Sequence, residues 1–339
     1  MLTLPAFEHH APRTLEEAVV LLSRYPDQVK VLAGGTDLIP NMKHRLFTPA
    51  HLVSLGAIAG LNRIRLEGDV LTIGAMCTLA QIASDPCVRS HLPSLAKAAS
   101  QVAGPQLREM GTLGGNLCLD TRCVYYNQTY FWRKALGFCL KKDGTVCHVV
   151  QGGSRCVAAA SNDTAPVLMT LDAVIRIIGP KGSRDIPILE LYTPDGIHNT
   201  VLQSNELVVE ARVKLPQGRV LAGYEKLRVR ASIDYPALTI ATAAEVTEKD
   251  RIRSVRVVVS SLAARPHFLR RLESFRGRVL NDSVVQTIAE TAYKQCHPLT
   301  NINVDSAWRR EMVPVYVRRC FQNAESTRLT SAIKGHPHC

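Results

Sequence analysis

The sequence lacks the features that identify membrane and secreted proteins. No run of about 18 apolar residues is present, which argues against a membrane-spanning helix. The N-terminus shows no basic region followed by an apolar stretch, so we expect no secretory signal. The expected location is the cytoplasm, where thiols stay reduced and clustered cysteines more often hold metal than form disulfides.

The familiar catalytic motifs are also missing. The 339 residues contain no recognisable Ser-His-Asp set, no H-E-x-x-H motif and no paired acid–base carboxylates. The remaining function class is cofactor binding and electron transfer, in which the cofactors carry the chemistry.

A long basic block is absent as well, although the formal net charge is +12. The basic residues are scattered in pairs such as Arg270-Arg271 and Arg318-Arg319, without an RNA-binding signature. We therefore expect no nucleic acid partner. A solvated basic surface explains the charge, and an acidic protein partner or anionic ligand is the other interpretation.

Two glycine loops are present. A predicted strand, residues 29–33, runs into Gly34-Gly35-Thr36-Asp37-Leu38, and a second loop has the sequence Thr112-Leu113-Gly114-Gly115-Asn116. Such loops let backbone amides approach a phosphate, because glycine has no Cβ. Neither has the G-x-G-x-x-G spacing of a doubly wound dinucleotide fold. Together they predict one pyrophosphate held between them, with Asn116 either adopting a left-handed backbone or donating to the ligand.

Five of the ten cysteines lie between Cys118 and Cys156, and six of the eighteen aromatic residues lie between Tyr125 and Phe138. The spacing Cys123-x15-Cys139-x7-Cys147-x8-Cys156 lacks the C-x2-C pairs of zinc fingers and bacterial ferredoxins. Four thiols could still bind an iron–sulfur cluster or a zinc ion, or they could remain free. The aromatic residues would exclude water from the site. A dry surrounding matters more for a redox cluster, whose potential it controls, than for structural zinc. Cys118 is close to the second glycine loop, so we interpret it as a packing residue.

The remaining pattern predicts strands with few helices over residues 50–215. It then predicts a separate three-stranded domain covered by helices, including helices at residues 284–293 and 307–320. Asp163 either accepts hydrogen bonds from sugar hydroxyls or caps a helix. Lys226 either reaches an anionic ligand or forms an exposed salt bridge.

The combination of motifs resembles a known family, the FAD-binding medium subunits of the xanthine dehydrogenase family of molybdenum hydroxylases. The resemblance covers nearly the whole chain. The segments that carry it are Val31-Leu32-Ala33-Gly34-Gly35-Thr36-Asp37-Leu38, Thr112-Leu113-Gly114-Gly115-Asn116, Asp163-x-Ala-Pro, Tyr224-x-Lys226 with Arg230-x3-Asp234, and Asp305-x2-Trp308-Arg309.

The resemblance implies an α+β fold of the vanillyl-alcohol-oxidase type, with a small α/β part at residues 1–55, a middle α+β part at 56–220, a C-terminal domain at 221–324 and a tail at 325–339. It implies that both glycine loops cradle the FAD diphosphate, that Val102 and Val209 lie near the flavin ring, and that Asp163 and Lys226 lie near the cofactor. The implied FAD-binding residues are Val31, Leu32, Ala33, Gly34, Gly35, Thr36, Asp37, Leu38, Val102, Thr112, Leu113, Gly114, Gly115, Asn116, Asp163, Val209 and Lys226.

The chain departs from most members by an insertion of about 40 residues, 118–158, which holds the cysteines. It resembles the insertion of the 4-hydroxybenzoyl-CoA reductase subfamily, in which four cysteines carry a [4Fe–4S] cluster. That role would fall to Cys123, Cys139, Cys147 and Cys156.

The same resemblance implies several partners. They are a large subunit with a molybdenum cofactor that removes a phenolic hydroxyl, a small subunit with two [2Fe–2S] clusters, and a ferredoxin-like donor, in a dimer of heterotrimers. Electrons would enter through the cluster and FAD. Two other functions stay open: an oxidative hydroxylase subunit whose insertion is only a docking loop, and a zinc-stabilised binding or scaffold protein.

Overall fold

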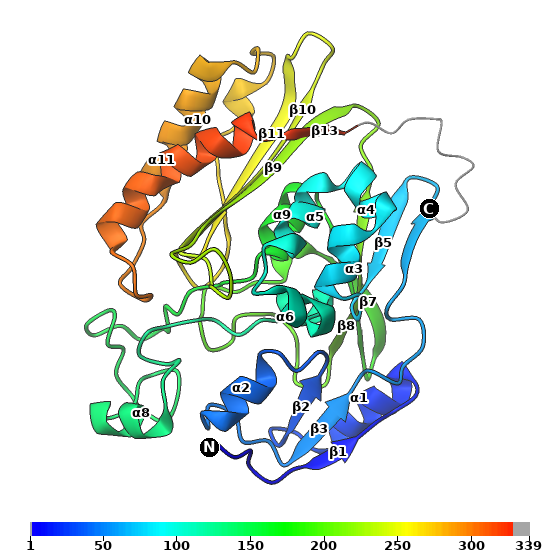
Figure 1. Cartoon of the computed structure of the whole chain (residues 1–339), viewed down its shortest axis with the longest axis vertical. Helices are drawn as coiled ribbons and strands as arrows, with labels where there is room; N and C mark the ends of the chain where they lie inside the picture. Colours follow the sequence, from blue (N-terminus) through cyan, green and yellow to red (C-terminus); the bar gives the residue numbers. More distant parts are fainter. Residues whose placement is uncertain (1, 328–339) are drawn as a thin grey trace.

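Three β-sheets follow one another along the chain in the computed structural model, which describes residues 2–327 (Figure 1). The first is parallel, with strand order β1-β3-β2. Its strands are β1 (Glu8–His10), β2 (Val29–Leu32) and β3 (His51–Ser54). Helix α1 (Leu15–Arg24) packs against it through a buried face, and α2 (Leu38–Lys43) follows the first glycine loop.

The second sheet is antiparallel, with strand order β4-β5-β8-β6-β7. Its strands are β4 (Ile64–Glu67), β5 (Val70–Gly74), β6 (Val174–Gly179), β7 (Gly182–Pro187) and β8 (Leu207–Lys214). A β-bulge interrupts the pairing of β6 with β8, because Arg176 pairs with Glu210 whereas Ile177 pairs with Val208. Val209 is therefore the extra residue of β8.

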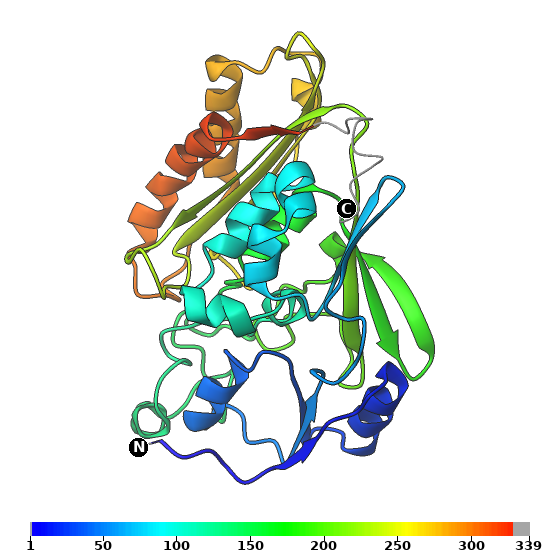
Figure 2. The same cartoon turned by 45° about the vertical axis from the view of Figure 1, so that its right-hand side comes forward.

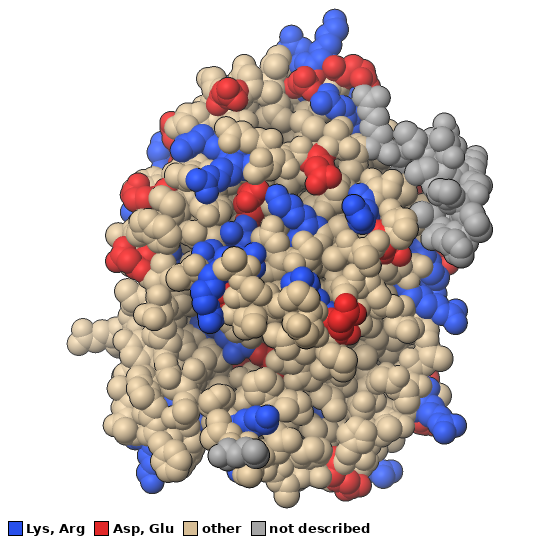
Figure 3. All heavy atoms as spheres, viewed as in Figure 1, with Lys and Arg blue, Asp and Glu red and all other residues tan. Residues whose placement is uncertain are grey.

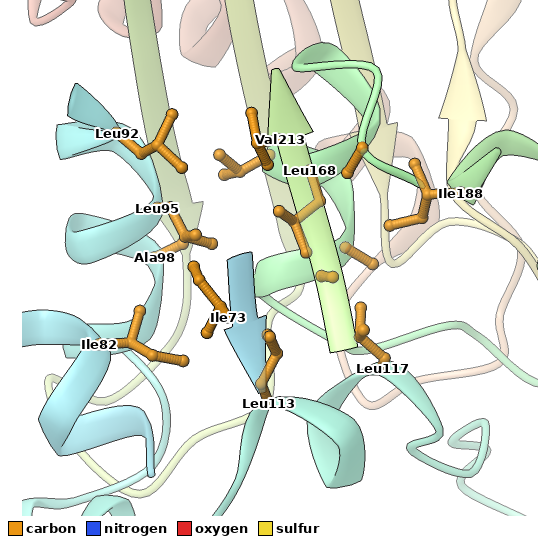
Figure 4. Close-up of a cluster of buried hydrophobic side chains, with 14 of the residues drawn as sticks. Ile73, Ile82, Leu92, Leu95, Ala98, Leu113, Leu117, Leu168, Ile188 and Val213 are labelled. Carbon is orange, nitrogen blue, oxygen red and sulfur yellow. The ribbon is translucent and has the colours of Figure 1, made fainter. Parts of the chain in front are cut away.

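The prediction of few helices over residues 50–215 is wrong, because seven short helices lie there. They are α3 (Leu79–Ser84), α4 (Pro86–His91), α5 (Pro93–Ser100), α6 (Pro105–Met110), α7 (Leu113–Leu117), α8 (Tyr130–Leu136) and α9 (Thr164–Thr170). Three of them begin with proline, whose fixed φ suits the first helical turn. Figure 4 shows the apolar core that these helices build with the second sheet, with Ile82, Leu95 and Leu113 facing Ile73 and Val213.

The third sheet has five strands, where the sequence predicted three. The long strands β9 (Arg219–Leu227), β10 (Leu238–Val246) and β11 (Ile252–Ser260) form the predicted core of the sheet. The short edge strands β12 (His267–Phe268) and β13 (Glu325–Thr327) complete the order β12-β11-β10-β9-β13. Helices α10 (Asp282–Gln295) and α11 (Ser306–Gln322) cover one face, and α5 and α9 pack on the other (Figure 2).

The α+β fold class is as predicted. The limits at residues 55 and 220 stay predictions, although the chain moves from one sheet to the next near both. Strand β13 lies in the predicted tail, of which residues 328–339 lie outside the described part. Basic and acidic side chains are interspersed over the face in Figure 3, and the region around α8 is mostly uncharged. None of the helices within residues 2–327 is both long and apolar enough to cross a bilayer.

Candidate functional site

The two glycine loops lie against each other and line one cleft of about 650 Å³. A Cβ on Gly34 would lie 1.7 Å from the carbonyl oxygen of Met110, two residues before the second loop. Only glycine allows this approach. Gly35 adopts φ +70°, a left-handed backbone that also favours glycine. The cleft volume is in the range of cofactor sites, which are about 300–1,000 Å³.

The first loop offers unpaired backbone donors. Within the described residues, none of the five amides from Gly34 to Leu38 has a protein acceptor. All five residues line the cleft. Because buried or half-buried amides are normally paired, a row of unpaired ones predicts an anionic ligand such as a diphosphate.

The second loop contributes differently. The amides of Leu113 and Gly114 donate to the carbonyls of Cys77 and Ala75 at 2.9 and 2.8 Å, so they are not available to a ligand. The Asn116 side-chain oxygen accepts from the backbone and hydroxyl of Thr164 at 3.1 and 2.6 Å. Its amide nitrogen is left for a ligand. The alternative of a left-handed backbone at Asn116 is wrong, because this residue lies inside helix α7.

Four of the five cysteines of the insertion lie together. Cys123, Cys139, Cys147 and Cys156 line one small cavity, with Tyr125, Tyr126 and His148 among the residues that enclose it. Cys139 and Cys156 are buried, and Cys123 and Cys147 are half-buried. Cys118 lines the large cleft instead, which agrees with its exclusion from the predicted ligand set.

Burial raises the pKa of the Cys123 thiol to about 11 and raises that of Cys156 as well, although Lys141 opposes the rise at Cys156. The protein alone therefore keeps these thiols protonated at neutral pH. Thiolates in this cavity need a bound metal to supply positive charge, and metal binding would release their protons.

Both halves of the chain match known protein families. Residues 5–218 match the FAD binding domain in molybdopterin dehydrogenase. Residues 222–324 match the CO dehydrogenase flavoprotein C-terminal domain. The chain belongs to the FAD-binding medium subunits of the molybdenum hydroxylase family.

Individual relatives agree with this assignment over nearly the whole length. The chain is 32% identical to the carbon monoxide dehydrogenase medium chain of Hydrogenophaga pseudoflava, over 94% of this chain and 97% of the relative. It is 31% identical to the aldehyde oxidoreductase FAD-binding subunit of Escherichia coli, over 87% and 92%. A solved structure of the Hydrogenophaga pseudoflava carbon monoxide dehydrogenase superposes with a TM-score of 0.78, at 28% identity and over 95% and 98% of the two chains.

In this molybdenum hydroxylase subunit, most of the predicted FAD-binding residues line the cleft. They are Val31, Ala33, Gly34, Gly35, Thr36, Asp37, Leu38, Val102, Thr112, Gly114, Gly115, Asn116 and Asp163. Four others do not line it: Leu32, Leu113, Val209 and Lys226. The neighbouring residues Leu207 and Val208 line the cleft, whereas Val209 does not. Contact of each residue with FAD stays a prediction.

Several cleft residues were not among the predicted FAD-binding residues. Asp120 belongs to the insertion, Asn199 to the connection before β8, and Ile233 and Tyr235 to the loop after β9. Arg122 donates to Asp37 and to the Tyr235 hydroxyl, and its guanidinium lies 4.1 Å from the Tyr235 ring centroid. The insertion thus joins the first glycine loop to the third sheet.

Asp163 and Lys226 form a buried ion pair at one wall of the cleft. The Lys226 ammonium lies 2.9 Å from the Asp163 carboxylate, and the Tyr224 hydroxyl donates to the same carboxylate at 2.5 Å. Lys226 also donates to the carbonyl of Gln101 at 3.1 Å. Burial raises the pKa of Asp163, and Lys226 and Tyr224 oppose that rise. Asp163 does stand at the N-cap position of α9, as one alternative predicted, but its side chain makes no capping hydrogen bond there. The alternative of an exposed salt bridge for Lys226 is wrong, because Lys226 is buried.

Replacing Asp163 with asparagine is expected to lower the free energy of unfolding by about 3–5 kcal/mol, because the Lys226 ammonium stays buried without a counter-charge. Urea unfolding of the FAD-loaded protein measures the loss. Since the two charges are coupled, Asp163→Asn combined with Lys226→Met should cost less than the sum of the single changes. Additive losses would show that the pair is not coupled.

An ion pair connects the wall of the cleft to the wall of the thiol cavity. Asp120 lines the cleft and Lys141 lines the cavity, and the Lys141 ammonium lies 2.7 Å from the Asp120 carboxylate. Lys141 also donates to the Thr121 hydroxyl at 2.6 Å. A group in the cavity and a group in the cleft would therefore be close neighbours.

The insertion is anchored to two separate parts of the chain. Arg133 of α8 is 1% exposed and donates to the carbonyls of His44 and Arg45 at 3.2 and 3.1 Å, after the end of α2. The amide of Val124 donates to the carbonyl of Asn301, which lies before α11. These contacts hold the thiols in place between the first sheet and the C-terminal domain.

Proposed function

We propose that this chain is an electron-transfer subunit that binds FAD in the cleft and a [4Fe–4S] cluster in the thiol cavity. The observation that carries the proposal is the meeting of four thiols, distant in sequence, in one cavity beside the cleft. Bound there, the two groups would supply one-electron and two-electron transfer between an external donor or acceptor and the partner subunits.

The spacing of the thiols supports a cluster over a single zinc ion. Tetrahedral zinc with bonds of about 2.3 Å holds its sulfur ligands about 3.8 Å apart. Within residues 2–327, however, no three of the four thiol sulfurs lie within 4.8 Å of one another. The only set of three metal-binding side chains that close together in this part of the chain is Glu8, His10 and His51. The four thiols are therefore spread more widely than zinc requires. A cubane cluster suits this wider set, because each thiolate binds a different iron atom.

The residues of this chain bind and insulate the two groups. The free amides of the first loop hold the diphosphate, and the Asn116 amide nitrogen is placed to donate to FAD. The aromatic wall of the insertion limits the access of water to the cluster. Lys141 places a positive charge between the two sites and favours the reduced, more negative state of the cluster.

We further propose that the complex is a 4-hydroxybenzoyl-CoA reductase in the cytoplasm. Its partners would be the large molybdenum subunit and the small subunit with two [2Fe–2S] clusters, in a dimer of heterotrimers, with a ferredoxin-like donor. The reaction replaces a phenolic C–OH by C–H, consumes two electrons and two protons, and releases water. The cysteine insertion supports this reaction, since a low-potential donor requires an added entry point for electrons.

A second candidate is a complex that oxidises its substrate and passes electrons outward through the same chain. Two relatives favour this candidate, because one is named as the medium chain of a carbon monoxide dehydrogenase and the other as the FAD-binding subunit of an aldehyde oxidoreductase. The same cleft and cavity would serve both directions of transfer.

Anaerobic turnover of the purified complex distinguishes the two candidates. With reduced ferredoxin and 4-hydroxybenzoyl-CoA, we expect benzoyl-CoA to form, detected by mass spectrometry, and none to form when the donor is left out. An unchanged thioester, together with aldehyde oxidation in the presence of an electron acceptor, would overturn the reductase and support the oxidative complex.

A further inference from the structure

Three potential metal ligands converge on one face of the first sheet, away from the cleft and the thiol cavity. Strands β1 and β3 are parallel, and their register places Glu8 beside His51. His10 follows Glu8 by two residues, so its side chain leaves the same face of β1. None of the three residues lines the FAD cleft.

The distances between the three ligand atoms match one tetrahedral metal ion. His10 Nε2 lies 3.1 Å from His51 Nδ1. Carboxylate oxygens of Glu8 lie 3.5 Å from His51 Nδ1 and 3.7 Å from His10 Nε2. Zinc bonds of about 2.0–2.1 Å to nitrogen and oxygen place neighbouring ligands about 3.3–3.5 Å apart. Small side-chain rotations would bring all three atoms into this range.

Aromatic stacking holds the two imidazoles in position. The Tyr25 ring, directly after α1, stacks on His51 with a centroid distance of 3.7 Å and on His10 at 5.7 Å. Both histidine side chains are 15% exposed, whereas Glu8 is 64% exposed. Two stacked imidazoles and one exposed carboxylate leave a fourth position open toward solvent.

We propose that Glu8, His10 and His51 form a Zn²⁺ site that fastens strand β1 to β3. Strand β1 is the three-residue edge of the sheet, so it has few backbone hydrogen bonds of its own to hold it. Two of the ligands lie on β1 and one on β3, and a shared ion therefore links the strands. The chemistry of two imidazoles and one carboxylate, with no thiol, selects a borderline cation and not calcium or magnesium.

The test uses the FAD-loaded, cluster-loaded protein under anaerobic conditions, so that the thiols are already occupied. One equivalent of Zn²⁺ is added, and zinc X-ray absorption identifies its ligands. We expect nitrogen and oxygen at about 2.0–2.1 Å with imidazole scattering. Sulfur at about 2.3 Å would overturn the proposal, because zinc would then occupy thiols. A calorimetric titration of the same sample without a binding isotherm would also overturn it.

Matched variants locate the site. His10→Ala should weaken Zn²⁺ binding by at least about 100-fold, since loss of supporting groups alone often weakens metal sites by 10–100-fold. The control is His9→Ala on the same strand, because His9 is exposed and its side chain leaves the opposite face. His9→Ala should bind zinc as the parent does. Equal affinities in both variants would overturn the assignment, and unchanged FAD content would confirm that each variant is folded.

Discussion

The Cys139→Ser variant is expected to lose most of its iron and to keep its FAD. Cys139 is buried in the thiol cavity, and a serine hydroxyl does not replace a thiolate as a cluster ligand there. The FAD cleft is built from other residues, so flavin content should stay near one per chain. The rate of flavin reduction by the external donor should fall by at least about 100-fold, because loss of a group that only supports a metal ligand already costs about 10–100-fold in activity. Iron analysis and anaerobic stopped-flow absorbance measure the two effects.

Cys118→Ser is the matched control for iron content. It removes a thiol from the same insertion, but Cys118 lines the cleft and not the thiol cavity. Iron content should therefore equal that of the parent protein. If Cys139→Ser kept its full iron content and donor reactivity, the cavity would not be a cluster site, and the insertion would act as a docking loop or a zinc site.

The Gly34→Ala variant is expected to be purified with little or no FAD. The added Cβ would lie 1.7 Å from the Met110 carbonyl oxygen, so the first loop has to move away from the second. That movement displaces the free amides that face the cofactor, and it costs about 3 kcal/mol of stability, the upper range for overpacking. Flavin absorbance after gel filtration and thermal unfolding measure both effects.

Gly56→Ala provides the comparison. The nearest atom to a Cβ at Gly56 is the Ser54 hydroxyl oxygen at 3.7 Å, an ordinary contact, and φ there is not left-handed. FAD content and stability should both stay close to those of the parent. Equal FAD content in Gly34→Ala and the parent would contradict the assignment of the cleft to the diphosphate.

The glycine loops and the cysteines could be identified from sequence because their chemistry is local. Gly35 adopts a left-handed backbone, and Gly34 lies against the backbone carbonyl of Met110. Both conditions require glycine, and glycine can be read directly from the sequence. The grouping of four spaced thiols followed from their number and the aromatic residues around them. The distances between the thiols could not be predicted, since irregular loops and the single short helix α8 connect them.

The errors came from features that depend on tertiary context. Helices α6 and α7 are too short for a periodic pattern, although Pro105 and the capping Thr112 mark their starts. The cleft ends at Val208, one residue before the predicted Val209, which is the extra residue of a bulge that the sequence does not show. Tyr224 and Lys226 share a face of β9 by their spacing, but only the folded chain shows that Asp163 lies opposite them.

Mössbauer spectroscopy of anaerobically purified, iron-57-labelled protein, with parallel metal and flavin analysis, tests the central claim most directly. The account predicts about four irons in one cubane cluster, no stoichiometric zinc at the thiols and one FAD per chain. Zinc bound to sulfur, or four free thiols beside a full complement of FAD, would contradict it.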